Sequence, residues 1–204
     1  WLYTLWRTAG SNEQEVRLTA DHLVGANLAG HDSHGVGMVL PYVRSLQAKE
    51  LQLNQILTVV TDTGSLLVVD GNRGIGQSMA YQTMNLAIER ARQNGVVIVG
   101  LKNTHHIGRV WHWAEMAIAA NLASIHFTNV VSRPIVAPHG GRQGRLGTNP
   151  LTVGLPRRDG PGQIEIWAAG RSAKGVTLNM KYASWAPLLS CEAIITPVAA
   201  DKTR

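Results

Sequence analysis

Apolar runs typical of strands alternate with helical patterns through the middle of the chain, and this alternation constrains the fold more than any other feature. Runs at 56–60 and 65–71 predict two strands, and the continuously apolar run at 96–101 predicts a strand buried on both faces. Between them, apolar residues from Ala80 to Ala91 recur with the period of an amphipathic helix. Further helix and strand patterns follow, so the sequence predicts an α/β fold with a mixed, largely parallel sheet.

The first 55 residues have helical periodicity instead of this alternation. One helix is expected to end near Gly30, and residues 36–48 predict another. We therefore expect a helical N-terminal lobe at 1–55 beside an α/β domain at 56–160.

The composition narrows the classes of ligand. The net charge is +6, and arginines gather loosely between Arg133 and Arg158, which favours anionic ligands. One Phe and four Tyr leave few rings for stacking on bases, and no nucleic-acid-binding motif is present. An anionic small molecule is therefore the expected ligand, and nucleic acid is not. The absence of a long apolar run, the single cysteine (Cys191) and the lack of a signal-peptide pattern predict a cytoplasmic protein without membrane attachment or internal disulfide.

The stretch "GHDSHGVGM" (30–38) concentrates groups that can move a proton. The imidazole of His34 titrates near neutral pH, the adjacent Ser33 hydroxyl can orient it, and Asp32 can bias its tautomer. The alternative is a structural role, because a histidine stabilises a helix C-terminus and a glycine ends the helix. His31 and His34 are three residues apart, as in some metal sites, but the spacing supplies no third ligand, so no metal is expected.

The loop "NTHHIGR" (103–109) follows the expected strand at 96–101, where α/β sheets bind ligands. His105 and His106 point to opposite sides if the loop is extended, so one of them can face a pocket. Arg109 can hold a phosphate or a carboxylate with its planar fork. The alternative is that one histidine is packed and the other is exposed.

Two glycine-containing loops complete the set of candidates. The glycines of "GNRGIG" (71–76) do not have the spacing of the dinucleotide-binding fingerprint, so the sequence does not support a Rossmann site and favours a turn. The stretch "GTNP" (147–150) offers a hydroxyl and a side-chain amide. It either binds a ligand or opens the next strand at Leu151.

Four stretches carry a family resemblance: "ADHLVGANLAGHDSHGVGMVLPYVRSL", "VVDGNRGIGQ", "NTHHIGR" and "VAPHGGRQGRLGTNPL". In order and spacing they resemble the malate/L-lactate dehydrogenase family of the non-Rossmann type, most of all its hydroxycarboxylate dehydrogenase B type. The resemblance runs from about Leu2 to about Arg158. It implies hydride transfer between NAD or NADP and the 2-carbon of a small 2-hydroxy or 2-keto acid, a cofactor-binding domain at 56–160, and a homodimer.

The resemblance also implies roles for individual residues. His34 is the expected proton donor or acceptor with Ser33 as its relay partner, and His106 is expected to lie at both substrate and cofactor. The catalytic set is Ser33, His34 and His106, and the cofactor-binding set is His106, Ile107, Gly108, Arg109, Thr148 and Asn149.

The chain departs from the family pattern in two places. Met38 stands where many members carry an arginine that holds the substrate carboxylate, which leaves Arg44 and Arg109 as candidate replacements. The family's Leu-Asp-x-Ala-Thr-Ser stretch is not recognisable after the strand that follows "TNP". We therefore expect a truncated or frameshifted product after about residue 160, with an incomplete sheet and a non-family tail at 161–204 that is a candidate for disorder. The alternative function is a catalytically dead fragment that retains only nucleotide binding or dimerisation.

Overall fold

The computed structural model describes residues 1–131, 134–139 and 141–158, and the backbone of strands at 163–168, 171–172, 180–183 and 193–199. Arg133 and Cys191 lie outside the described residues. Within the described part of the chain, no helix has both the length and the apolar character needed to cross a membrane.

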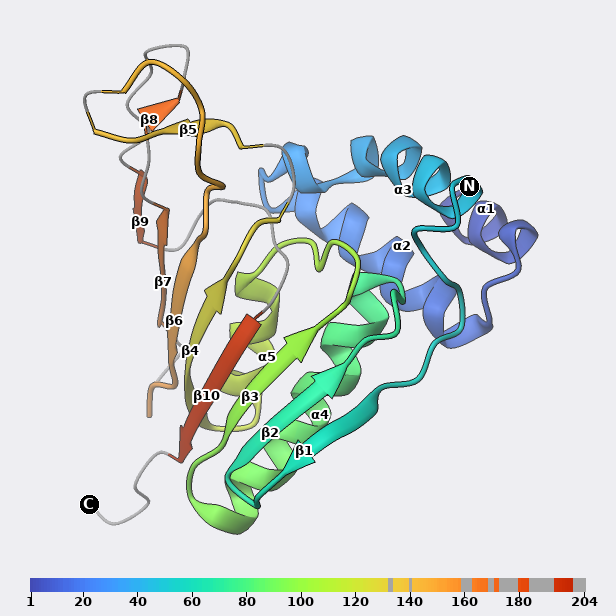
Figure 1. The fold of residues 1–204 in the computed structure, drawn as a ribbon. Helices are drawn as coiled ribbons and strands as arrows, with labels where there is room; N and C mark the ends of the chain where they lie inside the picture. The colour runs from blue at the N-terminus through green and yellow to red at the C-terminus, as the bar shows by residue number, and fades with distance from the viewer. Residues whose placement is uncertain are drawn as a thin grey trace.

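The N-terminal lobe is helical, as expected from its periodicity (Figure 1). It consists of α1 (Leu2–Ala9), α2 (Glu13–Leu28), two short 3-10 turns (Asp32–His34 and Val36–Met38) and α3 (Val39–Gln47). Trp6, Leu23 and Tyr42 lie at the centre of its apolar core, and Ile75 joins this core from the segment just before α4. The lobe is therefore packed onto the α/β domain through shared apolar burial.

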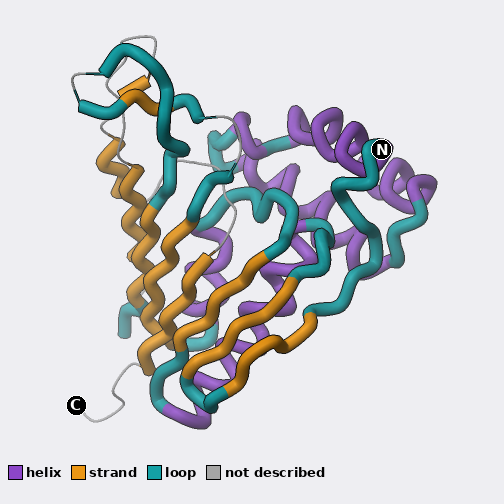
Figure 2. Tube along the Cα trace, in the orientation of Figure 1, coloured by secondary structure: helices purple, strands orange, loops and turns teal. Residues whose placement is uncertain are grey.

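The α/β domain is built on one eight-stranded sheet (Figure 2). Its strands lie in the order β1-β2-β3-β10-β4-β6-β7-β9, and β5 and β8 form a separate pair. The elements are β1 (Thr58–Asp62), β2 (Leu66–Asp70), α4 (Gly76–Asn94), β3 (Ile98–Lys102), α5 (Trp111–Ala119), β4 (Leu122–Thr128), β5 (Val136–Ala137), β6 (Leu151–Leu155), β7 (Gln163–Ala168), β8 (Arg171–Ser172), β9 (Met180–Ala183) and β10 (Ala193–Ala199). The domain boundaries at 55 and 160 stay predictions.

The α/β class and the mixed sheet are confirmed, but the expectation that the sheet is largely parallel is wrong. Only β2 and β3 pair in parallel among the described strands, and every other ladder is antiparallel. The reason is the position of β10, which pairs antiparallel with both β3 and β4 and so separates them. β3 and β4 still run in the same direction, as the helix between them requires, without being neighbours.

Helices α4 and α5 cover one face of the sheet (Figure 1). Along β2 and β3, buried residues alternate with more exposed ones. On β3, Val99 is fully buried whereas Ile98 is 43% exposed, so the expected burial of this strand on both faces is wrong. The buried side packs against α4 and α5 through Leu67, Val69 and their neighbours. The opposite side exposes apolar residues of several strands, namely Leu66, Ile98, Ile125, Phe127 and Leu155.

The carboxyl ends of β2 and β3 point toward the helical lobe (Figure 1). The loop 103–110 leaves β3 at this edge and leads directly into α5. The fold therefore places the "NTHHIGR" loop against the lobe that carries "GHDSHGVGM".

Two adjacent leucines on β2 test which face of the sheet supports folding. Leu67 is fully buried and Leu66 is 44% exposed, so Leu67→Ala should lower the free energy of unfolding by about 2–5 kcal/mol. Leu66→Ala should cost less than about 1 kcal/mol. Urea unfolding of the two variants measures both values, and equal losses would contradict the one-sided packing of this sheet.

Candidate active site

Three imidazoles meet where the lobe faces the loop after β3. The ring centroids of His31 and His34 lie 4.0 Å apart, and those of His34 and His106 lie 5.0 Å apart. All three residues are buried. His34 and His106, which are 72 positions apart in the sequence, are thus neighbours in the fold.

The turn that carries His34 is held by the side chain of Asn27 at the end of α2. Asn27 Nδ2 donates to Asp32 at 2.5 Å, and Asn27 Oδ1 accepts from the Val36 backbone at 2.8 Å. Gly35 is required here, because a Cβ at this position would lie 2.1 Å from Asn27 Oδ1. Asn27 therefore fixes the direction in which the 3-10 turn leaves the helix.

Ser33 lies beside His34 as expected, with its Oγ 2.9 Å from His34 Nδ1. The expected influence of Asp32 on the His34 tautomer is wrong, because the Asp32 carboxylate is bonded to Asn27 instead. The other ring nitrogen, His34 Nε2, is buried and has no hydrogen-bond partner among the described residues. That nitrogen is left for a ligand.

His106 is anchored from behind by residues that the sequence analysis did not single out. Its Nδ1 lies 2.6 Å from the hydroxyl of Tyr42 on α3, and Gln77 Nε2 of α4 donates to the same hydroxyl at 2.8 Å. Gly76 permits the close approach of α4, since a Cβ there would lie 2.0 Å from the His106 carbonyl oxygen. Gly76 in "GNRGIGQ" was the sequence signal for this close approach. The sequence analysis interpreted these glycines as a turn and did not predict the contact with His106.

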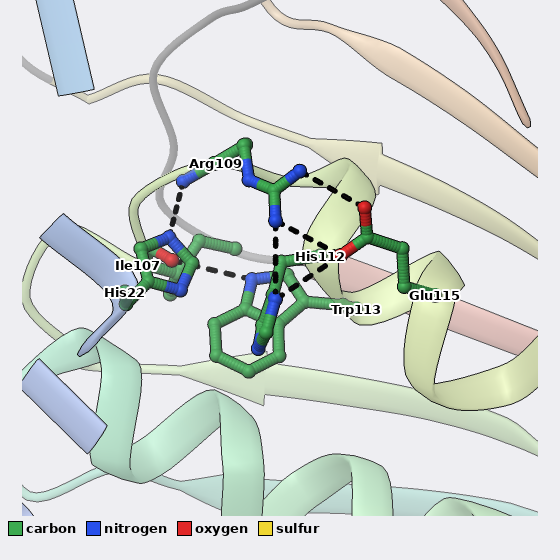
Figure 3. A network of polar contacts seen from close by, with 6 residues as sticks. All are labelled: His22, Ile107, Arg109, His112, Trp113 and Glu115. Carbon is green, nitrogen blue, oxygen red and sulfur yellow. Dashed lines mark hydrogen bonds and ion pairs between the residues drawn. The ribbon is translucent and has the colours of Figure 1, made fainter. Parts of the chain in front are cut away.

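A polar network joins the lobe to the same loop (Figure 3). His22 Nε2 on α2 accepts a hydrogen bond of 2.7 Å from the Arg109 backbone N–H. The Arg109 guanidinium donates to both carboxylate oxygens of Glu115 at 2.9 Å and lies 4.8 Å from the ring centre of Trp111. Arg109 is therefore already paired with Glu115, whereas Arg44 is exposed on α3. Their expected role as replacements for the arginine that stands at the Met38 position in many relatives stays a prediction.

The remaining predicted cofactor residues fall into two places. Ile107 is part of the core, and its carbonyl accepts from Trp113 Nε1 at 3.2 Å, while Gly108 adopts a left-handed conformation with φ +73°. Thr148 and Asn149 lie on the segment that enters β6, next to the end of β4. Asn149 Oδ1 accepts from the Val130 backbone at 2.8 Å, and Thr148 Oγ1 is buried without a hydrogen-bond partner in the described residues.

Burial sets the protonation of the imidazoles. It lowers the pKa of His34 to about 2 and that of His31 to about 3, and it drives the pKa of His106 well below its usual range. Arg109 and the His106 imidazole act in the same direction on the pKa of His31, because they disfavour another positive charge. All three rings are therefore neutral near pH 7.

The buried polar atoms of the site that have no partner among the described residues can hydrogen-bond with a nicotinamide nucleotide. Nitrogens of His34 and His106 and the hydroxyl of Thr148 are buried without partners in the described part, and buried polar groups require hydrogen bonds. The amide and hydroxyl groups of a nicotinamide nucleotide can supply such bonds. Within the described residues, no group of three or more His, Cys, Asp or Glu side chains is arranged to hold a metal.

The buried histidines predict a loss of stability in mild acid. Burial lowers the pKa of His22, His31, His34, His105, His106 and His126. Below about pH 6.5 these residues bind protons in the unfolded chain before they do so in the folded one. The free energy of unfolding should therefore fall as pH drops from 7.5 to 5.5, by up to about 1.4 kcal/mol per pH unit for each histidine. Urea unfolding across this range measures the slope, and His34→Gln should reduce it; an identical slope in this variant would contradict the neutral, buried state of His34.

Gly108→Ala should open the junction between the lobe and the loop. A Cβ at this position would lie 2.2 Å from His22 Nε2, on a backbone that alanine already disfavours. Gly95→Ala is the matched control, because Gly95 has φ +79° but nothing within 4 Å of an added Cβ. We expect Gly108→Ala to lower the free energy of unfolding by about 1–3 kcal/mol more than Gly95→Ala. Equal losses, measured by urea unfolding, would show that the close contact with His22 does not support the fold.

Comparisons with known proteins identify the family of the chain. The malate/L-lactate dehydrogenase family model matches residues 1–175, past the last resemblance motif. Hydroxycarboxylate dehydrogenase B of Escherichia coli K12 is 47% identical over 177 residues, which cover 87% of this chain and 49% of that protein. L-lactate dehydrogenase of Cupriavidus necator is 43% identical over 142 residues, covering 69% of this chain and 41% of the relative.

A solved structure shows the same fold. The malate dehydrogenase of Pyrococcus horikoshii superposes with a TM-score of 0.77 at 30% identity, and the match covers 92% of this chain and 57% of that one. The chain spans about half the length of the curated relatives it matches. The resemblance inferred from the motifs, including that to hydroxycarboxylate dehydrogenase B, is confirmed, and the chain belongs to the malate/L-lactate dehydrogenase family of oxidoreductases.

Proposed function

We propose that this chain carries the proton-handling half of a nicotinamide-dependent oxidoreductase that acts on a small 2-hydroxy or 2-keto acid. The observation that carries the proposal is the pair of buried, neutral imidazoles of His34 and His106, whose centroids lie 5.0 Å apart at the carboxyl edge of the sheet. Oxidation of an alcohol needs a base for the hydroxyl proton and a donor that holds the oxygen. Two unprotonated imidazoles with unsatisfied nitrogens can perform these two tasks.

His34 is the proposed base. Its buried ring is neutral and its Nε2 has no hydrogen-bond partner among the described residues, so this nitrogen can accept the hydroxyl proton of the substrate, while Ser33 at Nδ1 orients the ring and relays the proton. His106 holds the same substrate oxygen by a hydrogen bond. In the reverse direction the same groups return the proton to the oxygen of a keto acid.

The proposed cofactor is NAD or NADP, which when bound supplies or accepts hydride at the substrate 2-carbon. His106, Ile107 and Gly108 form the wall of the site, and Thr148 and Asn149 contribute from the β6 entry. Arg109 also lines the proposed site, where Glu115 holds its guanidinium over the ring of Trp111. A guanidinium that is already paired with a carboxylate binds a second anion weakly. Arg109 is therefore proposed to line the site sterically and not to bind an anionic group of the cofactor.

The substrate is proposed to be small because the imidazole cluster is enclosed by buried residues. Met38 carries no charge and Arg109 is paired with Glu115, so neither offers a free cation to the substrate carboxylate. Neutral donors such as His31, whose ring nitrogens have no partner among the described residues, are proposed to hold this carboxylate instead. We further propose a cytoplasmic homodimer that binds neither nucleic acid nor membranes.

A second candidate is a fragment that binds nucleotide or dimerises without turnover. The exposed apolar face of the sheet, which includes Leu66, Ile98 and Phe127, favours it, because such faces usually contact another protein surface. The two candidates differ in whether a 2-keto acid is reduced.

His34→Gln separates them from each other. Oxidation of NADH with pyruvate or oxaloacetate, followed by absorbance, should fall by about 10²- to 10⁴-fold in this variant, as expected when a general acid–base group is removed. NADH binding, followed by quenching of tryptophan fluorescence, should stay within about threefold, because the ring is proposed to act on the substrate proton. NADPH is titrated in parallel.

The exposed His139 provides the control, and His139→Gln should leave both quantities unchanged. NADH binding without turnover in the unaltered chain would support the second candidate. If the unaltered chain neither binds NADH nor reduces a 2-keto acid, the nicotinamide site is refuted. If turnover survives His34→Gln, the proposed role of His34 is refuted.

A further inference from the structure

Tyr42 is a buried tyrosine of the lobe core whose hydroxyl reaches out of that core to His106. The ring packs near Trp6 and meets His105 edge-on, which explains its burial. Packing alone does not explain why the hydroxyl lies 2.6 Å from His106 Nδ1, since a phenylalanine would fill the same space. The position of the Tyr42 hydroxyl is therefore explained by its hydrogen bond to His106 and not by the packing of the ring.

We propose that Tyr42 and Gln77 are positioning residues that fix the tautomer of His106, so that the ring presents Nε2–H to the site it shares with His34. The consequence for catalysis rests on the proposed function, but the tautomer itself does not. Neither residue touches the reacting atoms in this proposal, and both act through His106.

The direction of the hydrogen bonds follows from the atoms involved. Gln77 Nε2 is a hydrogen-bond donor and cannot accept, so the Tyr42 oxygen accepts a hydrogen bond of 2.8 Å from it. The single phenolic proton then goes to His106 Nδ1 at 2.6 Å, because the alternative acceptor, the His106 carbonyl oxygen, is 3.4 Å away. A neutral imidazole that accepts at Nδ1 carries its proton on Nε2.

That Nε2–H is available to a ligand of the candidate site. His106 Nε2 is buried without a hydrogen-bond partner among the described residues, and the ring lies at 39° to that of His34. The low pKa that burial imposes on His106 keeps the ring in a single-proton state near pH 7. His106 is then a neutral donor to the substrate oxygen, and His34, held at Nδ1 by Ser33, is left to exchange the proton.

The opposite order of hydrogen bonds would give the opposite chemistry. If the Gln77 amide oxygen faced Tyr42, the phenol would donate to Gln77, and His106 would donate from Nδ1. Its Nε2 would then be an acceptor, and the site would contain two competing bases. The two arrangements differ in which ring nitrogen of His106 carries the proton. Nitrogen-15 NMR spectra distinguish the two cases directly.

The test is a long-range proton–nitrogen NMR spectrum of the full 204-residue chain with nitrogen-15-labelled histidine, near pH 7. His106→Gln assigns the resonances. We expect the Nε2–H pattern for His106 in the unaltered protein. Tyr42→Phe, which keeps the ring but removes the hydroxyl, should change the ratio of the two tautomers by about fivefold or more. Gln77→Leu should shift it in the same direction by less, and circular dichroism confirms that each variant is folded.

Tyr81→Phe is the matched control, because Tyr81 is a partly buried tyrosine on α4 outside the site, and it should leave the His106 signals unchanged. An Nδ1–H pattern in the unaltered protein overturns the proposal, and so does a pattern that Tyr42→Phe leaves intact. If the chain also turns over, Tyr42→Phe should lower kcat about fivefold or more while the Kd for NADH stays within threefold. A tautomer that responds as expected in a chain without turnover refutes the proposed function and leaves this inference standing.

Discussion

The candidate site depends on one hydrogen bond between two parts of the fold, from the Arg109 backbone N–H to His22 Nε2 on α2. It is possible because Gly108 adopts a left-handed conformation and has no side chain to meet His22. The contact holds the loop after β3 against the lobe. Together with the hydrogen bond between the Tyr42 hydroxyl and His106 Nδ1, it places His106 on the loop beside His34 on the lobe.

Burial at this junction decides the electrostatics. Excluding water from the imidazoles makes the protonated state costly, so His31, His34 and His106 are neutral near pH 7. The nearest cation, Arg109, is neutralised by Glu115 at the rim of the cluster. The site is therefore rich in hydrogen-bonding groups and poor in fixed charge, which suits proton exchange with a neutral alcohol. Asn27, Tyr42 and Gln77 add the directional hydrogen bonds that orient the rings.

Most of the elements could be predicted from the sequence because their signals are local. The helical period of α4, the strand at β2 and the turn at "GHDSHG" appear in the structure within a few residues of their expected bounds. The sheet order could not be predicted, because β10 lies far along the chain from β3 and β4 between which it inserts. The exposure of Ile98 was missed for a related reason: a continuous apolar run does not reveal which side of a strand the helices will cover.

The order of residues along the chain specifies which chemical groups are available: a serine–histidine pair beside glycine, a histidine pair after a strand, and an arginine near them. It also determined the family, because ordered motifs are a linear property. The fold is needed to bring His106 beside His34, to pair Arg109 with Glu115, to bond the Asp32 carboxylate to Asn27, and to place the Tyr42 hydroxyl at His106. Each of these depends on contacts between residues distant in sequence or on the direction of one side chain, and hydrogen bonding and desolvation act through space.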